Sequence, residues 1–206
     1  MMSGLMLIFL FIAISFMIET ESQKQEMRDV AISYRDTKAN LNETLYNEFE
    51  KDLDRWDASI TEDNHIVFSS PELLFEVSKS DIKDEFKTIL EAFFARYITI
   101  LTSKEYKGEI LEVKVEGHTS KRWDSATSPQ EIYLKNMKLS QSRAYKVLAF
   151  CYSLKDDVIN KNRVWIEKHF RANGMAFSQL KGIAKARRVE FSVTLKSEDK
   201  VYKILK

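Results

Sequence analysis

The first eighteen residues form an almost unbroken apolar run. Between Met1 and Ile18 no residue is charged, and only Ser3, Gly4 and Ser15 interrupt the run. A helix of this length spans roughly 26 Å, slightly less than the ~30 Å hydrocarbon core of a bilayer. No basic region precedes the run and no small-residue cleavage site follows it. The pattern therefore predicts an uncleaved transmembrane helix over residues 1–18 instead of a secretory signal.

A second pattern, amphipathic instead of uniformly apolar, begins at residue 19. Residues 19–60 contain no Pro or Gly, and their apolar positions lie three, four or seven residues apart, which predicts one face of a continuous helix. The members of this stripe are Met27, Val30, Tyr34, Leu41, Leu45, Phe49, Leu53 and Trp56. The stripe needs a partner surface, either the same helix in a second copy or the protein's own domain, and both remain open. We assign residues 19–61 to a helical linker.

From residue 62 onward, short β-prone segments alternate with longer helical ones. Alternating apolar and polar positions predict strands over 65–68, 110–116 and 187–195. Helical spacing predicts helices over 81–101, with Asp81 near the N-cap, over 134–154 and over 158–170. This order predicts an α+β or α/β sandwich in which one mixed sheet packs against helices. We assign residues 62–206 to this domain.

Composition excludes several function classes. The chain has 32 Lys and Arg against 31 Asp and Glu, a formal net charge of +1, so no overall field favours binding to nucleic acid. The three histidines lack the spacing of zinc ligands, and no nucleophile elbow, P-loop or dinucleotide-binding turn occurs. The single cysteine, Cys151, lies in an apolar helical pattern and is predicted to be buried and inert. We predict no enzymatic activity, no metal and no cofactor.

The polar loop after the 110–116 strand is the strongest candidate for a binding site. Gly117 allows a tight turn at the end of the strand. Ser140 is predicted as the N-cap of the next helix, which would leave backbone N–H groups free for an anion. Arg143, one turn further on, has the geometry for a two-pronged contact with a carboxylate. The pattern indicates a small acidic ligand, with an internal pairing of Arg143 to a nearby Glu as an equal alternative.

Three segments resemble the peptidoglycan-binding signature of OmpA-like domains. EGHTS, NMKLSQSRAYKV and ARRVEFSV follow the order of that family's pattern, GHTD, N..LS..RA..V and NRRVEI, and the resemblance covers residues 62–196. In that family the loop aspartate holds the amine of diaminopimelate and the LSxxRA arginine holds its carboxylate. The resemblance implies that Arg143 matches this arginine and Asn136 the loop asparagine. The implied site comprises Thr119, Ser120, Asp124, Asn136, Leu139, Ser140, Arg143 and Arg187.

Two positions depart from the family pattern. Ser120 stands where the loop aspartate is expected, and Ala186 replaces the asparagine before the paired arginines. A neutral hydroxyl supplies no charge to attract an ammonium group, and the loss of a charge-assisted hydrogen bond weakens a contact by roughly 1.5–3 kcal/mol. We predict that Asp124, four residues further on, replaces the missing carboxylate.

The apolar opening also resembles a known family. It is similar to the membrane helix of MotB-type stator proteins, and SGLM together with GHTS resembles the B subunits of Zorya anti-phage defence systems in particular. The resemblance implies a single-pass inner-membrane protein with a periplasmic domain that binds peptidoglycan. It also implies a homodimer that works with a multi-helix membrane partner subunit in a proton-driven stator.

The ion-carrying residue of that family has no counterpart in the run. The aspartate would fall one residue before Met1, which leaves Ser3 as the polar side chain of the ion pathway. A serine hydroxyl lines a path but does not titrate at ordinary pH. We therefore expect the N-terminus to be incomplete. Two alternatives stay open: a flagellar-type stator subunit, and a passive anchor between membrane and wall that conducts no ions.

Overall fold

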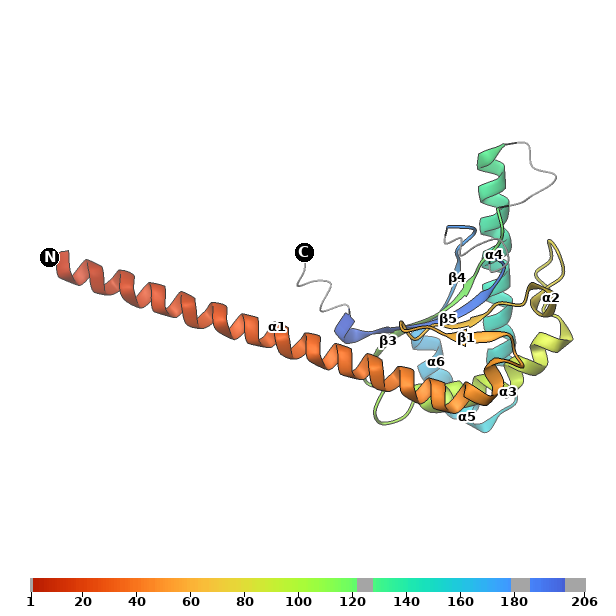
Figure 1. Ribbon diagram of the computed structural model, residues 1–206, viewed down its shortest axis with the longest axis horizontal. Helices are drawn as coiled ribbons and strands as arrows, with labels where there is room; N and C mark the ends of the chain where they lie inside the picture. Colours follow the sequence, from red (N-terminus) through yellow and green to blue (C-terminus); the bar gives the residue numbers. More distant parts are fainter. Residues whose placement is uncertain (1, 122–127, 179–185, 199–206) are drawn as a thin grey trace.

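A long N-terminal helix projects from a body that is built of one sheet and several helices (Figure 1). The computed structural model describes residues 2–121, 128–178 and 186–198, and for residues 2–5, 71 and 72 it describes the backbone alone. Helix α1 (Met2–Leu53) is continuous over 52 residues. The predicted membrane helix and the predicted linker are therefore two parts of a single helix.

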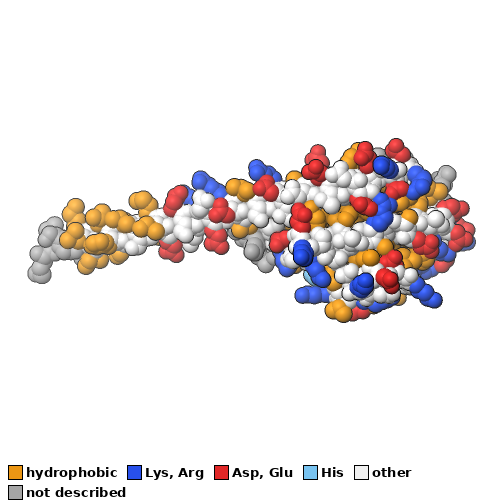
Figure 2. Space-filling model, turned by 90° about the horizontal axis from the view of Figure 1, so that it is seen from below, with side chains coloured by type: hydrophobic (Ala, Val, Ile, Leu, Met, Phe, Trp, Pro, Cys, Tyr) orange, Lys and Arg blue, Asp and Glu red, His pale blue; other side chains and the backbone are white. Residues whose placement is uncertain are grey.

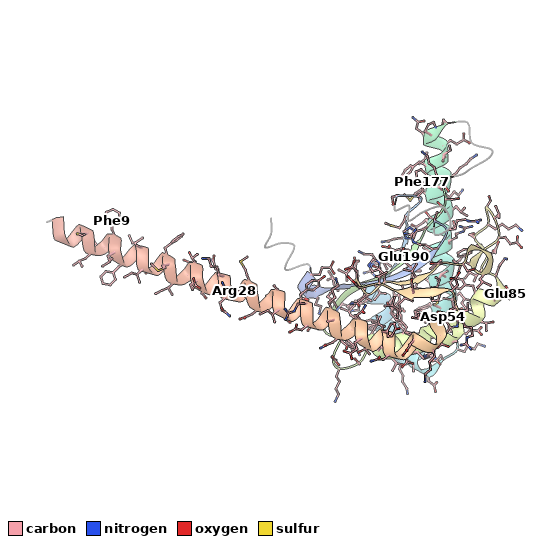
Figure 3. The ribbon with its side chains drawn as sticks, viewed as in Figure 1. Phe9, Arg28, Asp54, Glu85, Phe177 and Glu190 are labelled. Carbon is pink, nitrogen blue, oxygen red and sulfur yellow. The ribbon has the colours of Figure 1, made fainter. Side chains whose placement is uncertain are left out.

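The N-terminal part of α1 presents its apolar side chains to the surroundings. Phe9 is 64% exposed and Phe16 is 71% exposed, and Figure 3 shows Phe9 far from the body. Within the part of the chain that the structure describes, α1 is the one helix long and apolar enough to cross a membrane. Apolar side chains are unfavourable in water when no other part of the protein covers them. This exposure is therefore the pattern expected of a surface that faces lipid.

The second half of α1 belongs to the core of the body. Leu41, Leu45 and Phe49 are fully buried, whereas Met27 is 41% exposed. The ring of Phe49 lies 5.2 Å from that of Phe93. Two partner surfaces were considered for the apolar stripe of residues 19–60. The C-terminal half of the stripe contacts one of them, the protein's own domain. The hydrophobic core therefore begins well before residue 62, the predicted start of the domain.

Five strands form a mixed sheet. They are β1 (Ala58–Ile60), β2 (Ile66–Phe68), β3 (Ile110–Gly117), β4 (Phe170–Gly174) and β5 (Val189–Leu195). Their order is β1-β2-β5-β3-β4, with β3 and β4 parallel and the other neighbours antiparallel. The three predicted strands are confirmed. β1 and β4 were not predicted, because β1 lies within the predicted helical linker and β4 overlaps the end of a predicted helix.

Helices cover one face of the sheet and build the core against it. They are α2 (Pro71–Leu74), α3 (Asp84–Leu101), α4 (Pro129–Ser153), α5 (Asp157–Lys161) and α6 (Arg163–His169). Phe93 of α3 packs edge-on against Phe191 of β5 with ring centroids 5.0 Å apart, and Cys151 is fully buried as predicted. The predicted architecture of an apolar helix followed by a sheet packed with helices is confirmed.

Helix boundaries differ from the prediction in three places. Helix α3 has Lys83 at its N-cap, and Asp81 instead pairs with Lys146 of α4 at 2.6 Å. Helix α4 begins at Pro129, where Ser128 accepts a hydrogen bond from the backbone N–H of Glu131. The helix expected over 158–170 is two short helices, α5 and α6, that meet at Asn162.

Candidate functional site

The candidate site lies where the ends of β3 and β4 meet the middle of α4. A Cβ atom added to Gly117 would lie 2.2 Å from the carbonyl oxygen of Ser140, and one added to Gly174 would lie 2.7 Å from the backbone nitrogen of Gln141. Both distances are far shorter than a van der Waals contact, so no side chain is accommodated at either strand end. These two glycines bring the loop after β3 directly onto α4.

Three predicted site residues share one face of α4. Asn136, Ser140 and Arg143 follow one another at helical spacing, and all are at most 4% exposed. Ser140 is not an N-cap, because α4 begins at Pro129 and Ser140 lies in its interior. The proposed set of free N–H groups at Ser140 is therefore wrong. The predicted helix began too late, at Leu134, because the polar residues before Leu134 show no helical spacing of apolar positions.

The hydroxyl of Ser140 anchors a loop instead. It donates to the carbonyl of Met137 at 2.9 Å and accepts from the backbone N–H of Ala176 at 3.0 Å. The backbone N–H of Thr119 donates to the carbonyl of Ala176 at 2.8 Å. Ala176, whose φ is 47°, therefore joins the GHTS loop to α4. The hydroxyl of Thr119 is buried and has no hydrogen-bond partner among the described residues.

Arg143 is a buried cation held by backbone carbonyls. Its Nε donates to the carbonyl of Lys79 at 2.9 Å and its Nη2 to that of Glu76 at 3.2 Å. The guanidinium carbon lies 4.7 Å from the ring centroid of Phe75. Burial lowers the pKa of Arg143 to about 10, and the charge of Arg187 acts in the same direction. The alternative of an internal pairing with a Glu carboxylate is not seen among the described residues, since both acceptors of Arg143 are main-chain oxygens.

The remaining predicted residues lie around this centre with fewer contacts. Leu139, Ser120 and Arg187 are half-buried. The amide of Asn136 donates to the carbonyl of Ile132 at 2.9 Å, within its own helix. Asp124 lies outside the described residues, and so does the side chain of Ser3. The structure thus brings Thr119 and Ser140 together around Ala176 and places Arg143 near Arg187.

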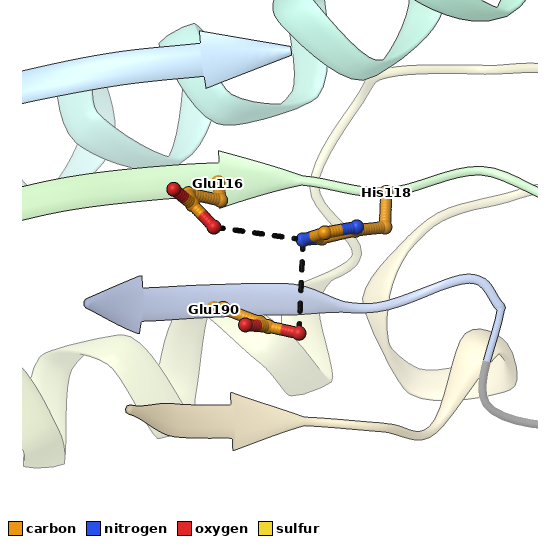
Figure 4. Close-up of side chains that lie close together, drawn as sticks. All are labelled: Glu116, His118 and Glu190. Carbon is orange, nitrogen blue, oxygen red and sulfur yellow. Dashed lines mark ion pairs between the residues drawn. The ribbon is translucent and has the colours of Figure 1, made fainter. Parts of the chain in front are cut away.

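A buried cluster of ionisable residues, missed by the sequence analysis, lies beneath the GHTS loop (Figure 4). Glu116 of β3 and Glu190 of β5 are directly opposite across the sheet. The Nε2 atom of His118 lies between them, 3.8 Å from an oxygen of Glu116 and 3.6 Å from an oxygen of Glu190. His118 and Glu190 are each 1% exposed. Each glutamate is next to a core residue of its strand, Val115 or Phe191, so strand alternation places both glutamates on the other face of the sheet and does not predict their burial.

Arg188 and His65 complete this cluster. The Nε of Arg188 donates to Glu190, and Nδ1 of His65 lies 3.3 Å from the other carboxylate oxygen. Burial alone would raise the pKa of Glu190, but the hydrogen bonds with His65 and Arg188 outweigh it and lower the pKa to about 2. Glu116, His118 and Glu190 place potential ligand atoms within 4.8 Å of one another. Because a fixed guanidinium already bonds Glu190, we interpret the cluster as an ion-pair network instead of a metal centre.

Comparison with known proteins then identifies the family. No family model matches the chain. The Zorya protein ZorB of Escherichia coli strain Crooks is 35% identical over 213 residues, which cover all of this chain and 89% of that protein. The chain belongs to the ZorB family. This membership agrees with the prediction that the chain is a structural subunit and not an enzyme.

Two solved structures are similar in fold to this ZorB-family chain. The periplasmic domain of Helicobacter pylori MotB aligns with a TM-score of 0.48 and 17% identity, over 72% of this chain and 95% of that domain. The cell wall anchor of the T6SS from Pseudomonas aeruginosa aligns with a TM-score of 0.47 and 20% identity, over 74% of this chain and 97% of that structure.

Proposed function

We propose that this ZorB-family chain is a wall-anchored subunit of a stator-type complex in the bacterial inner membrane. The apolar part of α1 crosses the membrane once, and the body binds peptidoglycan in the periplasm. The exposed apolar surface of α1 and its continuity with the buried residues Leu41 and Leu45 support this arrangement. A membrane span and a core element on one rigid helix transmit force without a hinge.

The wall contact is assigned to Arg143. A cation that is 4% exposed has little solvent to stabilise it, so it gains strongly from an anionic ligand. The carbonyls of Glu76 and Lys79 fix the guanidinium plane through Nε and Nη2, while Nη1 makes no hydrogen bond with a described residue. The buried, pre-oriented guanidinium is the observation that carries the proposal, and the carboxylate of diaminopimelate is its ligand.

The hydroxyl groups of the GHTS loop complete the proposed ligand contacts. The hydroxyl of Thr119 is buried without a partner among the described residues, which leaves a donor and acceptor for the peptide. Ser120 and Asp124 are assigned to the amine of diaminopimelate, with Asp124 supplying the negative charge. Asn136, Leu139, Ser140 and Arg187 are assigned supporting roles around Arg143.

The further proposals concern assembly. We assign to the chain a homodimeric state, a multi-helix membrane partner and, in the cell, a part in defence against phage. Proton conduction along α1 rests on the family resemblance, in which Ser3 lines the ion path.

Co-expression with the neighbouring multi-helix membrane protein tests this function. Wild-type chain should co-purify with that partner and protect cells in a phage plaque assay. Arg143→Ala should keep the partner but lose protection, because wall anchoring fails while the membrane assembly persists. Full protection by Arg143→Ala would contradict the wall-anchor role, and the absence of any partner would contradict the stator-type assembly.

A further inference from the structure

A basic groove lies on the body at the end opposite the candidate site. It is lined by β3, α6 and the residues after β5, and it has a volume of about 520 Å³. The lysines that line it are Lys107, Lys161, Lys168 and Lys196. None of the described residues that line the groove is acidic. Figure 2 shows Lys and Arg side chains at the end of the body from which α1 departs.

The groove combines these charges with exposed apolar side chains. Val164 is 79% exposed and Leu111 is 40% exposed, and both line the groove beside Trp165. Lysines around an apolar centre form the composition that binds an anionic lipid surface, where apolar groups enter the headgroup layer and ammonium groups pair with phosphates. An acidic polypeptide would use the lysines but leave Val164 without a partner.

The place of the groove along α1 brings it near a membrane. Lys196 also borders a second hollow, which α1 lines with residues between Ser22 and Ser33. These residues follow Ile18 by about 6 to 22 Å at 1.5 Å per residue. Glu26 and Asp29 of α1 line that hollow together with Glu109 and Lys196 of the body. Lys196 therefore places one edge of the groove beside the part of α1 that follows the apolar run.

We infer that this groove is a docking surface for anionic phospholipid headgroups, which holds the body against the outer face of the inner membrane. The inference uses one part of the proposed function, the membrane span of α1, and is independent of wall binding. Each lysine near an anionic membrane surface adds a favourable free energy of binding that changes the affinity roughly five-fold. Reversal of two lysines should therefore weaken docking by roughly thirty-fold or more.

The test uses the full chain in lipid nanodiscs with a reporter in the groove. Val164→Cys is labelled with bimane and quenched with the uncharged quencher acrylamide, in discs of phosphatidylcholine alone and in discs that also contain phosphatidylglycerol. The native thiol of Cys151 stays unlabelled, because it is fully buried and burial raises its pKa. We expect protection of the label only in the anionic discs, and loss of protection with Lys107→Glu/Lys168→Glu or at high salt.

The matched control is Lys51→Glu/Lys155→Glu, which changes the net charge equally at two exposed lysines outside the groove. It should leave the protection intact. Equal quenching in both kinds of disc, or an equal effect of the control pair, overturns the inference. Protection that appears in zwitterionic discs on addition of polyglutamate overturns the assignment to lipid. A chain that does not enter discs contradicts the membrane span and this inference with it, whereas failure of wall binding leaves the inference standing.

Discussion

Gly117, the last residue of β3, packs directly against the carbonyl oxygen of Ser140 in α4. An added Cβ atom would lie 2.2 Å from that oxygen and 3.2 Å from the backbone nitrogen of Ala144. Both obstacles are main-chain atoms of a long helix, so neither moves without displacing α4. Together with the close approach of Gly174 to Gln141, this contact holds the start of the GHTS loop against α4.

Gly117→Ala is therefore expected to destabilise the body and to displace the site. Overpacking of this kind costs about 1–3 kcal/mol, and ligand affinity should fall as α4 shifts. Denaturant unfolding of the full chain in detergent measures the first effect. Gly108→Ala is the matched control, since nothing lies within 4 Å of its added Cβ. Equal stability of the two variants would contradict the close packing of β3 on α4.

The role of α1 in the core gives a second prediction. Leu45→Ala should lower the free energy of unfolding of the body by about 2–5 kcal/mol, because Leu45 is fully buried. Tyr46→Ala, at the next position and 49% exposed, should have little effect. Both are measured by denaturant unfolding followed by the fluorescence of the tryptophans. A negligible effect of Leu45→Ala would show that residues 41–53 act as a detached linker.

The buried glutamate predicts a pH dependence. The pKa of Glu190 is lowered to about 2, so the stabilisation by its charged form is present at pH above about 4.5 and is lost as the pH falls toward 2. The effect is roughly 3 kcal/mol between these limits. Thermal unfolding across this range should show a steep loss for wild type and a flatter profile for Glu190→Gln.

Glu91→Gln serves as the control for this pH profile. Its side chain is exposed on α3, so the profile should follow that of wild type. If Glu190→Gln keeps the steep acid transition of wild type, the network of Glu190, His65 and Arg188 does not stabilise the fold.

The amine contact of the ligand can be tested within the GHTS loop. Asp124→Ala should weaken binding of diaminopimelate-containing peptide by roughly ten- to hundred-fold, since a charge-assisted hydrogen bond is lost. Ser120→Asp in the same chain should restore binding, because it returns the carboxylate to the family position. Titration calorimetry with the free peptide measures both. Unchanged affinity in Asp124→Ala would remove this residue from the site.

The sequence predicted the order of elements well, because strand alternation and helical spacing are local signals. It did not predict where α4 begins. The start at Pro129 follows a polar stretch without periodicity, and the misplaced start made Ser140 look like an N-cap. The partner surface of the amphipathic stripe was also undetermined, since burial of Leu41 depends on the fold and not on the neighbours of Leu41 in sequence.

The sequence predicted which residues belong to the candidate site, but only some of the contacts that these residues make. The motif residues Thr119 and Ser140 do meet, through Ala176, which no motif marks. The carbonyls that accept hydrogen bonds from Arg143 belong to Glu76 and Lys79. Because every residue has a backbone carbonyl, the sequence does not indicate which ones Arg143 contacts. The cluster around Glu190 was missed because each histidine was considered only as a zinc ligand and not as a neighbour of strand carboxylates.

The central claim is that Arg143 holds the wall peptide, and sedimentation of the full chain with diaminopimelate-containing sacculi tests it most directly. Arg163→Ala is the matched control, because Arg163 also stacks on an aromatic ring at 4.7 Å and bonds a backbone carbonyl, but lies at the start of α6. Thermal unfolding of each variant confirms the fold. We predict that Arg143→Ala lowers sacculus affinity roughly ten- to hundred-fold while Arg163→Ala keeps it. Equal binding by wild type, Arg143→Ala and Arg163→Ala would contradict the account.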